Sequence, residues 1–151
     1  MATVHDVAAY VLKRTGRIST MKLQKLVYYS QAWSLVWDEK PLFPEEIQAW
    51  ANGPVVWELY DKHRGRFSVE EWEWGERSNL TKDERETVKA VISSYGKFTG
   101  QQLSDLSHDE GPWQDARKGL PAGSYSSRTI SLDSIQAYYS GVSASDDSTE
   151  L

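Results

Sequence analysis

Hydrophobic side chains recur at intervals of three and four residues along most of the chain, the spacing that gathers them on one face of an α-helix. The first such segment carries apolar residues at Val4, Val7, Ala8, Val11 and Leu12. Gly16 follows it, and glycine is common just past the end of a helix because it adopts a left-handed conformation without a steric penalty. The pattern predicts an amphipathic helix at the N-terminus.

Residues 20–37 are apolar around most of a helical circumference, and only a narrow polar strip interrupts them. The strip consists of Gln24, Gln31 and Ser34. A helix that is apolar nearly all round is covered by neighbours on every side. We therefore predict that this segment is the central buried helix of the fold, with Thr20 as its N-cap.

The character of the sequence changes after this helix. Pro41 and Pro44 exclude a continuing helix, and the tripeptide Asn52-Gly53-Pro54 predicts a turn whose geometry depends on Gly53 and Pro54. Proline is favoured at the first position of a helix, because its fixed φ fits there and its missing N–H group would have no partner. We expect a helix over residues 55–64.

Residues 67–74 alternate only weakly between apolar and polar side chains and indicate at most a small β element. Two capping boxes follow, in which a threonine is paired with Glu or Gln three residues later: Thr81 with Glu84, and Thr99 with Gln102. Each predicts the start of a helix.

The last helix is expected over residues 131–139, closed by Gly141. Residues 142–151 are small, polar and acidic, too poor in apolar side chains to offset the entropy of ordering them, so we expect a disordered acidic C-terminal tail. No internal repeat or linker divides the preceding residues. The sequence therefore predicts a mainly α protein with a single compact multi-helix domain over residues 1–141.

The net charge of the chain bears on which classes of partner it is expected to bind. The chain has 151 residues and a formal net charge of −5, and much of that charge lies in the predicted tail, which leaves a nearly neutral body. Nucleic acid is therefore an unexpected partner. One local exception is the N-terminal segment, whose basic side chains are Lys13, Arg14, Arg17, Lys22 and Lys25. They form either a solvated helix end or a site for an anionic partner.

No stretch of the chain reaches the roughly 18 consecutive apolar residues that a membrane helix requires, and the first residues lack the basic region of a secretory signal. The absence of cysteine excludes disulfides and thiolate metal sites and suits a reducing compartment. We expect a cytoplasmic protein with no membrane partner.

No residue pattern indicates catalysis, a metal or a cofactor. The three histidines, His5, His63 and His108, lie far apart in the sequence, and neither a phosphate-binding glycine loop nor a GxSxG motif is present. A hydrolase resting on His108 and Asp109 is an alternative to a capping role for these two residues. We predict that the protein is not an enzyme and uses no cofactor.

Aromatic residues are abundant: seven tryptophans, eight tyrosines and three phenylalanines. Each ring buries roughly 150–250 Å², so one small core does not need all of them. We expect some rings at the surface, among them at least one of Trp50, Trp57, Trp72 and Trp74. Surface Trp and Tyr commonly anchor protein interfaces, which favours a partner-binding protein.

Several segments together resemble one known family. These are the run MKLQKLVYYSQAW at residues 21–33, Pro41-Leu42-Phe43, the run IQAWANGPVV at residues 47–56, Leu103-Ser104 with His108, and Pro112-Trp113. The chain resembles the Panacea domain family, also called SocA-like or phage-associated GepA-like, over about residues 4–139. It departs from the family pattern at Asn52, where an aromatic or similar residue more often precedes Gly-Pro.

The resemblance implies an antitoxin, a protein that keeps a toxin encoded beside it inactive. Family members are paired with very different toxins, and neutralisation is commonly by direct complex formation. We predict that the cognate toxin is bound by Lys22, Lys25, Trp50, Asn52, Val55 and Trp57, with Gly53 and Pro54 shaping the turn.

Three alternatives stay open at this point. One branch of the family acts as a proteolytic adaptor that delivers its toxin to the ClpXP protease, and the acidic tail is a place for such a second contact. The basic segment from Lys13 to Lys25 suggests a DNA-binding autoregulator instead. A homodimer that pairs through exposed aromatic side chains is also consistent with the sequence.

Overall fold

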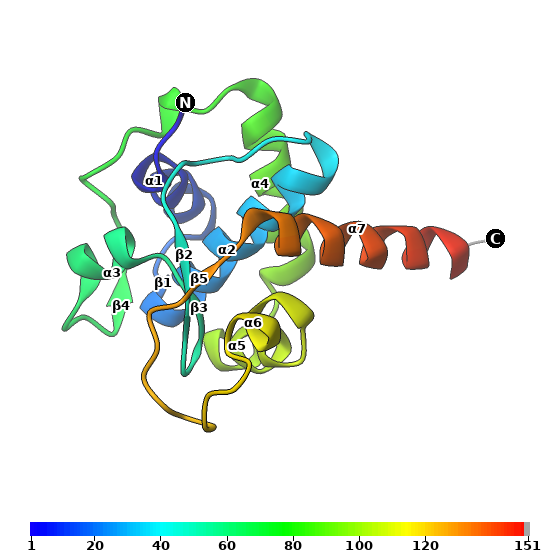
Figure 1. Cartoon of the computed structure of the whole chain (residues 1–151). Helices are drawn as coiled ribbons and strands as arrows, with labels where there is room; N and C mark the ends of the chain where they lie inside the picture. The colour runs from blue at the N-terminus through cyan, green and yellow to red at the C-terminus, as the bar shows by residue number, and fades with distance from the viewer. Residues whose placement is uncertain (150–151) are drawn as a thin grey trace.

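The protein is described by a computed structural model that covers the backbone of residues 1–149. It is mainly α, as the sequence predicts, and the α-helices are arranged around a central one (Figure 1). The α-helices are α1 (Val4–Thr15), α2 (Thr20–Trp37), α3 (Trp57–His63), α4 (Lys82–Tyr95), α5 (Gly100–His108), α6 (Gly111–Ala116) and α7 (Leu132–Thr149). A short 3₁₀ helix, η1 (Arg77–Asn79), precedes α4.

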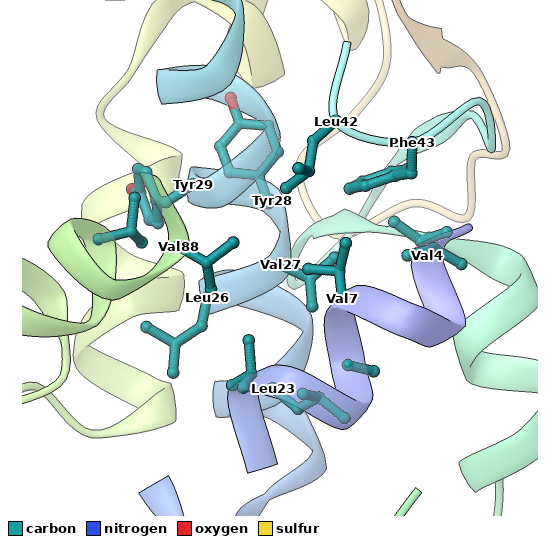
Figure 2. Packing of buried hydrophobic residues seen from close by; sticks show 14 of the residues in the cluster. Val4, Val7, Leu23, Leu26, Val27, Tyr28, Tyr29, Leu42, Phe43 and Val88 are labelled. Carbon is teal, nitrogen blue, oxygen red and sulfur yellow. The ribbon is translucent and has the colours of Figure 1, made fainter. Parts of the chain in front are cut away.

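Helix α2 is the centre of the core, as predicted. Every residue from Leu23 to Leu35 is buried, and α1, α4, α5 and α7 all pack against this helix. Figure 2 shows Leu26 and Val27 of α2 between Val7 of α1 and Val88 of α4. Burial of this contiguous apolar cluster is the main favourable contribution to folding.

The polar strip of α2 is buried with the rest of the helix, and two of its side chains, Gln31 and Ser34, bond to the backbone of the following loop. The Gln31 Oε1 atom accepts a hydrogen bond from Leu42 N–H at 2.6 Å, and Gln31 Nε2 donates to the Phe43 carbonyl oxygen at 2.9 Å. The Ser34 hydroxyl donates to the Lys40 carbonyl oxygen at 2.8 Å. These two side chains therefore satisfy backbone groups of a loop that has no helix or sheet of its own.

The strands form two small antiparallel sheets. Strand β1 (Ile18–Ser19) pairs with β4 (Ser68–Val69), which confirms the small β element predicted near residues 67–74. In the second sheet β2 (Ile47–Trp50) lies between β3 (Gly53–Val55) and β5 (Thr129–Ile130). The sequence did not predict this three-stranded sheet, because its strands are very short.

The predicted start of the third helix is wrong. Pro54 lies in strand β3, and helix α3 begins only at Trp57. Proline suits an edge strand as well as the first turn of a helix, since neither position needs its N–H group.

The N-cap of α2 is Ser19 and not Thr20. The Ser19 hydroxyl accepts a hydrogen bond from Lys22 N–H at 3.0 Å, whereas the Thr20 N–H group donates to the Phe67 carbonyl oxygen at 2.8 Å. The Thr20 N–H group is thus hydrogen-bonded to the residue that precedes β4. Both capping boxes predicted from the sequence, at Thr81 and at Thr99, are confirmed.

Helix α7 does not end at Gly141, as the sequence suggested, but continues to Thr149 and extends beyond the other elements in Figure 1. Val142 packs against the core, which extends the buried stripe of the helix past the glycine. The structure is therefore helical over residues 142–149, where we expected disorder, and residues 150 and 151 lie outside the described part. The division into a domain of residues 1–141 and a tail of residues 142–151 stays a prediction.

Candidate functional site

The β2–β3 hairpin carries five of the residues that the sequence singled out: Trp50, Asn52, Gly53, Pro54 and Val55. Trp50 pairs with Gly53 at its end, so the connecting residues are Ala51 and Asn52. Gly53 has φ 118°, a conformation that residues with a side chain rarely adopt, and Pro54 lies on the edge strand. Gly53 and Pro54 therefore lie in the strand that follows the turn, whereas the sequence placed them in the turn itself.

Side chains from α6 and the residue after it hold strand β2. The Trp113 indole N–H group donates to the Trp50 carbonyl oxygen at 2.7 Å. The buried Arg117 guanidinium donates to the Ala49 carbonyl oxygen at 2.9 Å and stacks over the Trp113 ring at 5.3 Å from its centroid. Because charged donors make strong hydrogen bonds, these contacts fix the strand to the helical body.

Helices α5 and α2 hold the other side of the hairpin. The Ser104 hydroxyl donates to the Asn52 carbonyl oxygen at 2.5 Å, and Lys25 Nζ donates to the Pro54 carbonyl oxygen at 3.1 Å. Gly53 lies against the Lys25 side chain, since a Cβ atom at this glycine would come within 2.8 Å of Lys25 Cε. The hairpin is therefore attached through its backbone to three helices or their ends.

Lys25 is not at the surface, where we expected it to meet acidic groups of a partner. The hairpin covers it, and only 2% of the residue is exposed. Burial lowers the pKa of the Lys25 ammonium group to about 7, because the charged form loses its hydration. The structure thus gives Lys25 a role in holding the hairpin and leaves it out of reach of a partner.

The remaining predicted contact residues differ in their exposure. Trp57 is 42% exposed, Asn52 is exposed and Trp50 is half-buried, whereas Val55 is buried. Lys22 lies away from the hairpin, where its Nζ atom donates to the Gly96 carbonyl oxygen at 2.6 Å. The structure therefore leaves Trp50, Asn52 and Trp57 at least partly accessible, buries Val55 within the hairpin and Lys25 beneath it, and places Lys22 elsewhere.

Tyr60 completes this surface, and sequence reasoning missed it. Its ring packs edge-on against Trp50 with 4.8 Å between centroids, and it lies one turn along α3 from Trp57. We call the surface formed by Trp50, Asn52, Trp57 and Tyr60 the hairpin–α3 face. The spacing of Trp57 and Tyr60, three residues apart on a helix, is the sequence signal that would have placed them together.

A row of rings continues from this face across the adjoining loop. Tyr60 contacts His63 at 5.6 Å, His63 contacts Trp72 at 6.3 Å, and Trp72 contacts Trp74 at 5.1 Å between ring centroids. Trp72 is buried and Trp74 is exposed, so the expectation that at least one of these rings reaches the surface is confirmed.

His108 lies flat on the Trp113 indole, with 4.2 Å between ring centroids. Burial lowers the pKa of its imidazole, and the nearby Lys25 charge lowers it further. Among the side chains that the structure describes, no three of His, Asp or Glu are grouped so as to hold a metal ion. The contacts of His108 are those of a packed ring at the base of the hairpin.

A buried carboxylate lies at the start of α6, and no sequence signal indicated it. Glu110 Oε1 accepts hydrogen bonds from Tyr29 Oη at 2.5 Å and from Tyr139 Oη at 2.9 Å. Tyr28 Oη lies 3.1 Å from Tyr139 Oη and extends the network. Burial raises the pKa of the Glu110 carboxyl group. The cluster fixes the start of α6, the helix whose Trp113 holds the hairpin.

Comparison with known proteins gives one match. The family model described as antitoxin SocA-like, Panacea domain, matches residues 23–114, a range that runs from α2 to α6 and includes the hairpin and α3. Neither the curated proteins nor the solved structures contain a match. In the described part of the chain, no helix combines the length and apolar character needed to cross a bilayer.

Proposed function

Because the chain belongs to the family of SocA-like antitoxins with a Panacea domain, we propose that it neutralises a protein toxin by binding it directly through the hairpin–α3 face. The toxin is the product of a neighbouring gene. In this proposal the protein acts by contact and transforms no substrate of its own.

The observation that supports this most strongly is the exposure of large rings on a rigid support. Trp57 is 42% exposed at the start of α3 and Trp50 is half-buried at the end of β2, and the hairpin backbone that precedes α3 is fixed by hydrogen bonds from α2, α5 and α6. A preformed surface loses little conformational entropy on binding, and Trp and Tyr contribute the largest share of binding free energy at many interfaces. These properties suit an antitoxin that must hold its toxin tightly.

The test is co-expression with the neighbouring gene, comparing two tryptophan variants. Trp57→Ala removes a ring from the hairpin–α3 face, and Trp37→Ala is the matched control, because Trp37 is 48% exposed but lies at the end of α2. We expect the neighbouring gene alone to arrest growth and the intact antitoxin to restore it. Trp57→Ala should weaken the purified complex about 10- to 100-fold, the usual range for an interface hot spot, while Trp37→Ala leaves it unchanged.

Growth rescue in cells that lack ClpXP distinguishes direct neutralisation from delivery to that protease. Rescue that persists in those cells supports direct binding. A harmless neighbouring gene product, or one that does not co-purify with the antitoxin, would overturn the proposal.

A further inference from the structure

A second surface feature lies at the opposite end of α5 from the hairpin. A groove of about 500 Å³ runs between the first turn of α2, the first turn of α5 and the segment before β4. The residues that matter for its chemistry are Thr20, Met21, Arg66, Phe67, Gly100 and Gln101. Its lining is mostly apolar, which is unusual for a solvent-filled surface groove.

Phe67 forms one wall and is 86% exposed. Its backbone is nevertheless fixed, because the Thr20 N–H group and the Thr20 hydroxyl both donate to the Phe67 carbonyl oxygen, at 2.8 and 3.3 Å. The next residues pair as β4 with β1. A large ring is thus held in water on an ordered segment, which is the arrangement of a preformed contact.

The other walls are two helix N-termini brought unusually close together. A Cβ atom at Gly100 would lie 2.9 Å from Lys22 N and 2.9 Å from Ser19 Oγ, so only glycine allows α5 to approach α2 here. The caps satisfy one amide in each helix, those of Lys22 and Gln102. Other first-turn N–H groups have no partner within the helix, and both helix dipoles place partial positive charge at this end.

The lining of the groove carries charge of one sign, and on its other side Arg66 borders a separate hollow lined by Glu70, Glu71 and Glu73. Arg66 is the charged residue of the groove lining, which contains no carboxylate. In the described part of the chain ion pairs join Arg17 to Glu70 and Arg64 to Asp61, and none involves Arg66. The groove therefore combines an apolar wall with an unpaired guanidinium and two positive helix ends.

We propose that this groove binds a segment of the toxin in which a large apolar side chain stands next to a carboxylate. The apolar side chain packs against Phe67 and Met21, and the carboxylate faces Arg66 and the first turn of α5. The identity of the partner rests on the proposed function, but the chemistry of the groove does not. A nucleic acid fits poorly, because the groove offers a single cation where phosphates need a row of them.

The chemistry is tested first, without the toxin. The intact chain, labelled with ¹⁵N, is titrated with N-acetyl-L-phenylalanine and separately with its neutral amide, and the amide signals of Met21, Gly100 and Gln101 are followed by NMR. We expect saturating shifts at millimolar concentration with the acid and at least threefold weaker binding of the amide. Arg66→Ser should abolish this preference, and Phe67→Ser should weaken both probes.

Shifts that do not saturate, that map elsewhere, or that are equal for acid and amide would overturn the proposed chemistry. Phe67 is exposed and its ring supports no buried contact, so Phe67→Ser is expected to retain the thermal stability of the parent. Light scattering of the free protein measures its oligomeric state. Loss of a dimer in Phe67→Ser would identify a second copy of this chain as the occupant and overturn the assignment to a toxin.

The partner is tested with the purified complex. We expect Phe67→Ser and Arg66→Ser each to weaken toxin binding at least fivefold. If the probes bind but neither variant affects the complex, the assignment to the toxin is wrong. If the probes fail while Trp57→Ala still disrupts the complex, the groove inference falls and the proposed function stands. If no complex forms, the proposed function falls, and the titration still reports on the groove.

Discussion

The side-chain amide of Gln24 pairs with the backbone of Val56 as a neighbouring strand would. Gln24 Oε1 accepts a hydrogen bond from Val56 N–H at 2.9 Å, and Gln24 Nε2 donates to the Val56 carbonyl oxygen at 3.1 Å. Both residues are buried. Val56 is the residue between β3 and α3, so this one side chain ties the central helix to the junction on which the hairpin–α3 face is built.

Replacing Gln24 with leucine should destabilise the protein strongly. The variant removes the partner of the buried Val56 N–H group and of the buried His63 Nε2 atom, which lies 3.0 Å from Gln24 Nε2, while the Val56 carbonyl oxygen keeps the Leu59 and Tyr60 amides. Each unsatisfied buried group costs about 1–3 kcal/mol. We expect the free energy of unfolding, measured by urea denaturation, to fall by about 2–4 kcal/mol. Gln114→Leu is the matched control, because Gln114 also bonds one backbone oxygen, that of His108, but is exposed. A loss as small as that of the control would contradict the assignment.

The buried ammonium group of Lys25 predicts an unusual dependence of stability on pH. Its pKa is about 7 in the folded protein, whereas an unfolded lysine has an ordinary pKa of 10.5. Between these values the unfolded chain binds more protons than the folded one, so stability rises with pH. We expect the free energy of unfolding of the parent to rise, relative to that of Lys25→Met, by up to about 1.4 kcal/mol per pH unit between pH 7 and 10.

The measurement is the difference in unfolding free energy between parent and variant across that range, since the titrations of groups that do not interact with Lys25 cancel in the difference. Lys13→Met, at an exposed position of α1, should show a flat difference. A flat difference for Lys25→Met as well would show that the buried amine titrates normally.

Glu110 predicts the opposite trend. Burial raises the pKa of its carboxyl group above the ordinary 4.5, so the folded protein retains a proton that the unfolded chain has released. The stabilising contribution of Glu110 to the free energy of unfolding is therefore lost as the pH rises from 4.5 through the folded-state pKa. Glu110→Gln keeps an oxygen that accepts hydrogen bonds from Tyr29 and Tyr139 but carries no charge. We expect it to become progressively more stable than the parent as the pH rises through this window.

Thermal unfolding at several pH values measures the effect, with Glu86→Gln on the exposed side of α4 as the control. If Glu110→Gln is more stable than the parent by the same amount at pH 4 and pH 8, burial does not raise the pKa of the Glu110 carboxyl group.

Local sequence signals were sufficient for most helix positions. Capping boxes at Thr81 and Thr99 fixed the starts of α4 and α5, since the cap and the amide that it satisfies lie within four residues of each other. The apolar circumference of residues 20–37 identified the central helix, because burial on every side is a property of that segment alone. The family resemblance drawn from the same runs is confirmed by the match over residues 23–114.

The site was less predictable, because its decisive contacts join segments far apart in the chain. Lys22 and Lys25 stand three residues apart on one helix, and nothing local distinguishes the half-buried from the fully buried one. The difference arises from the hairpin, whose Pro54 carbonyl oxygen accepts a hydrogen bond from Lys25 alone of the two. Pro54 in the same hairpin suggested the start of a helix, since proline suits either role.

Two glycines with positive φ give a test of how tightly the hairpin is packed. Gly53 has φ 118° and Gly65 has φ 81°, so an added side chain strains the backbone at both positions. Only at Gly53 does a Cβ atom also meet neighbours, Lys25 Cε at 2.8 Å and Ser107 Oγ at 3.0 Å, whereas nothing lies within 4 Å at Gly65. We expect Gly65→Ala to lose about 1–2 kcal/mol of unfolding free energy and Gly53→Ala distinctly more.

The steric part of the Gly53→Ala effect can be separated from the backbone strain by a double-mutant cycle with Lys25→Ala. Shortening Lys25 removes the atom that a methyl group added at Gly53 would strike, so the two losses should not add, with a coupling free energy of about 1 kcal/mol or more. Urea denaturation of the four proteins measures it. Gly65→Ala combined with Lys25→Ala should be additive, because these sites share no contact. Additive losses in the Gly53 cycle would mean that the hairpin does not rest on Lys25, and the rigid support of the hairpin–α3 face would then lack one of its contacts.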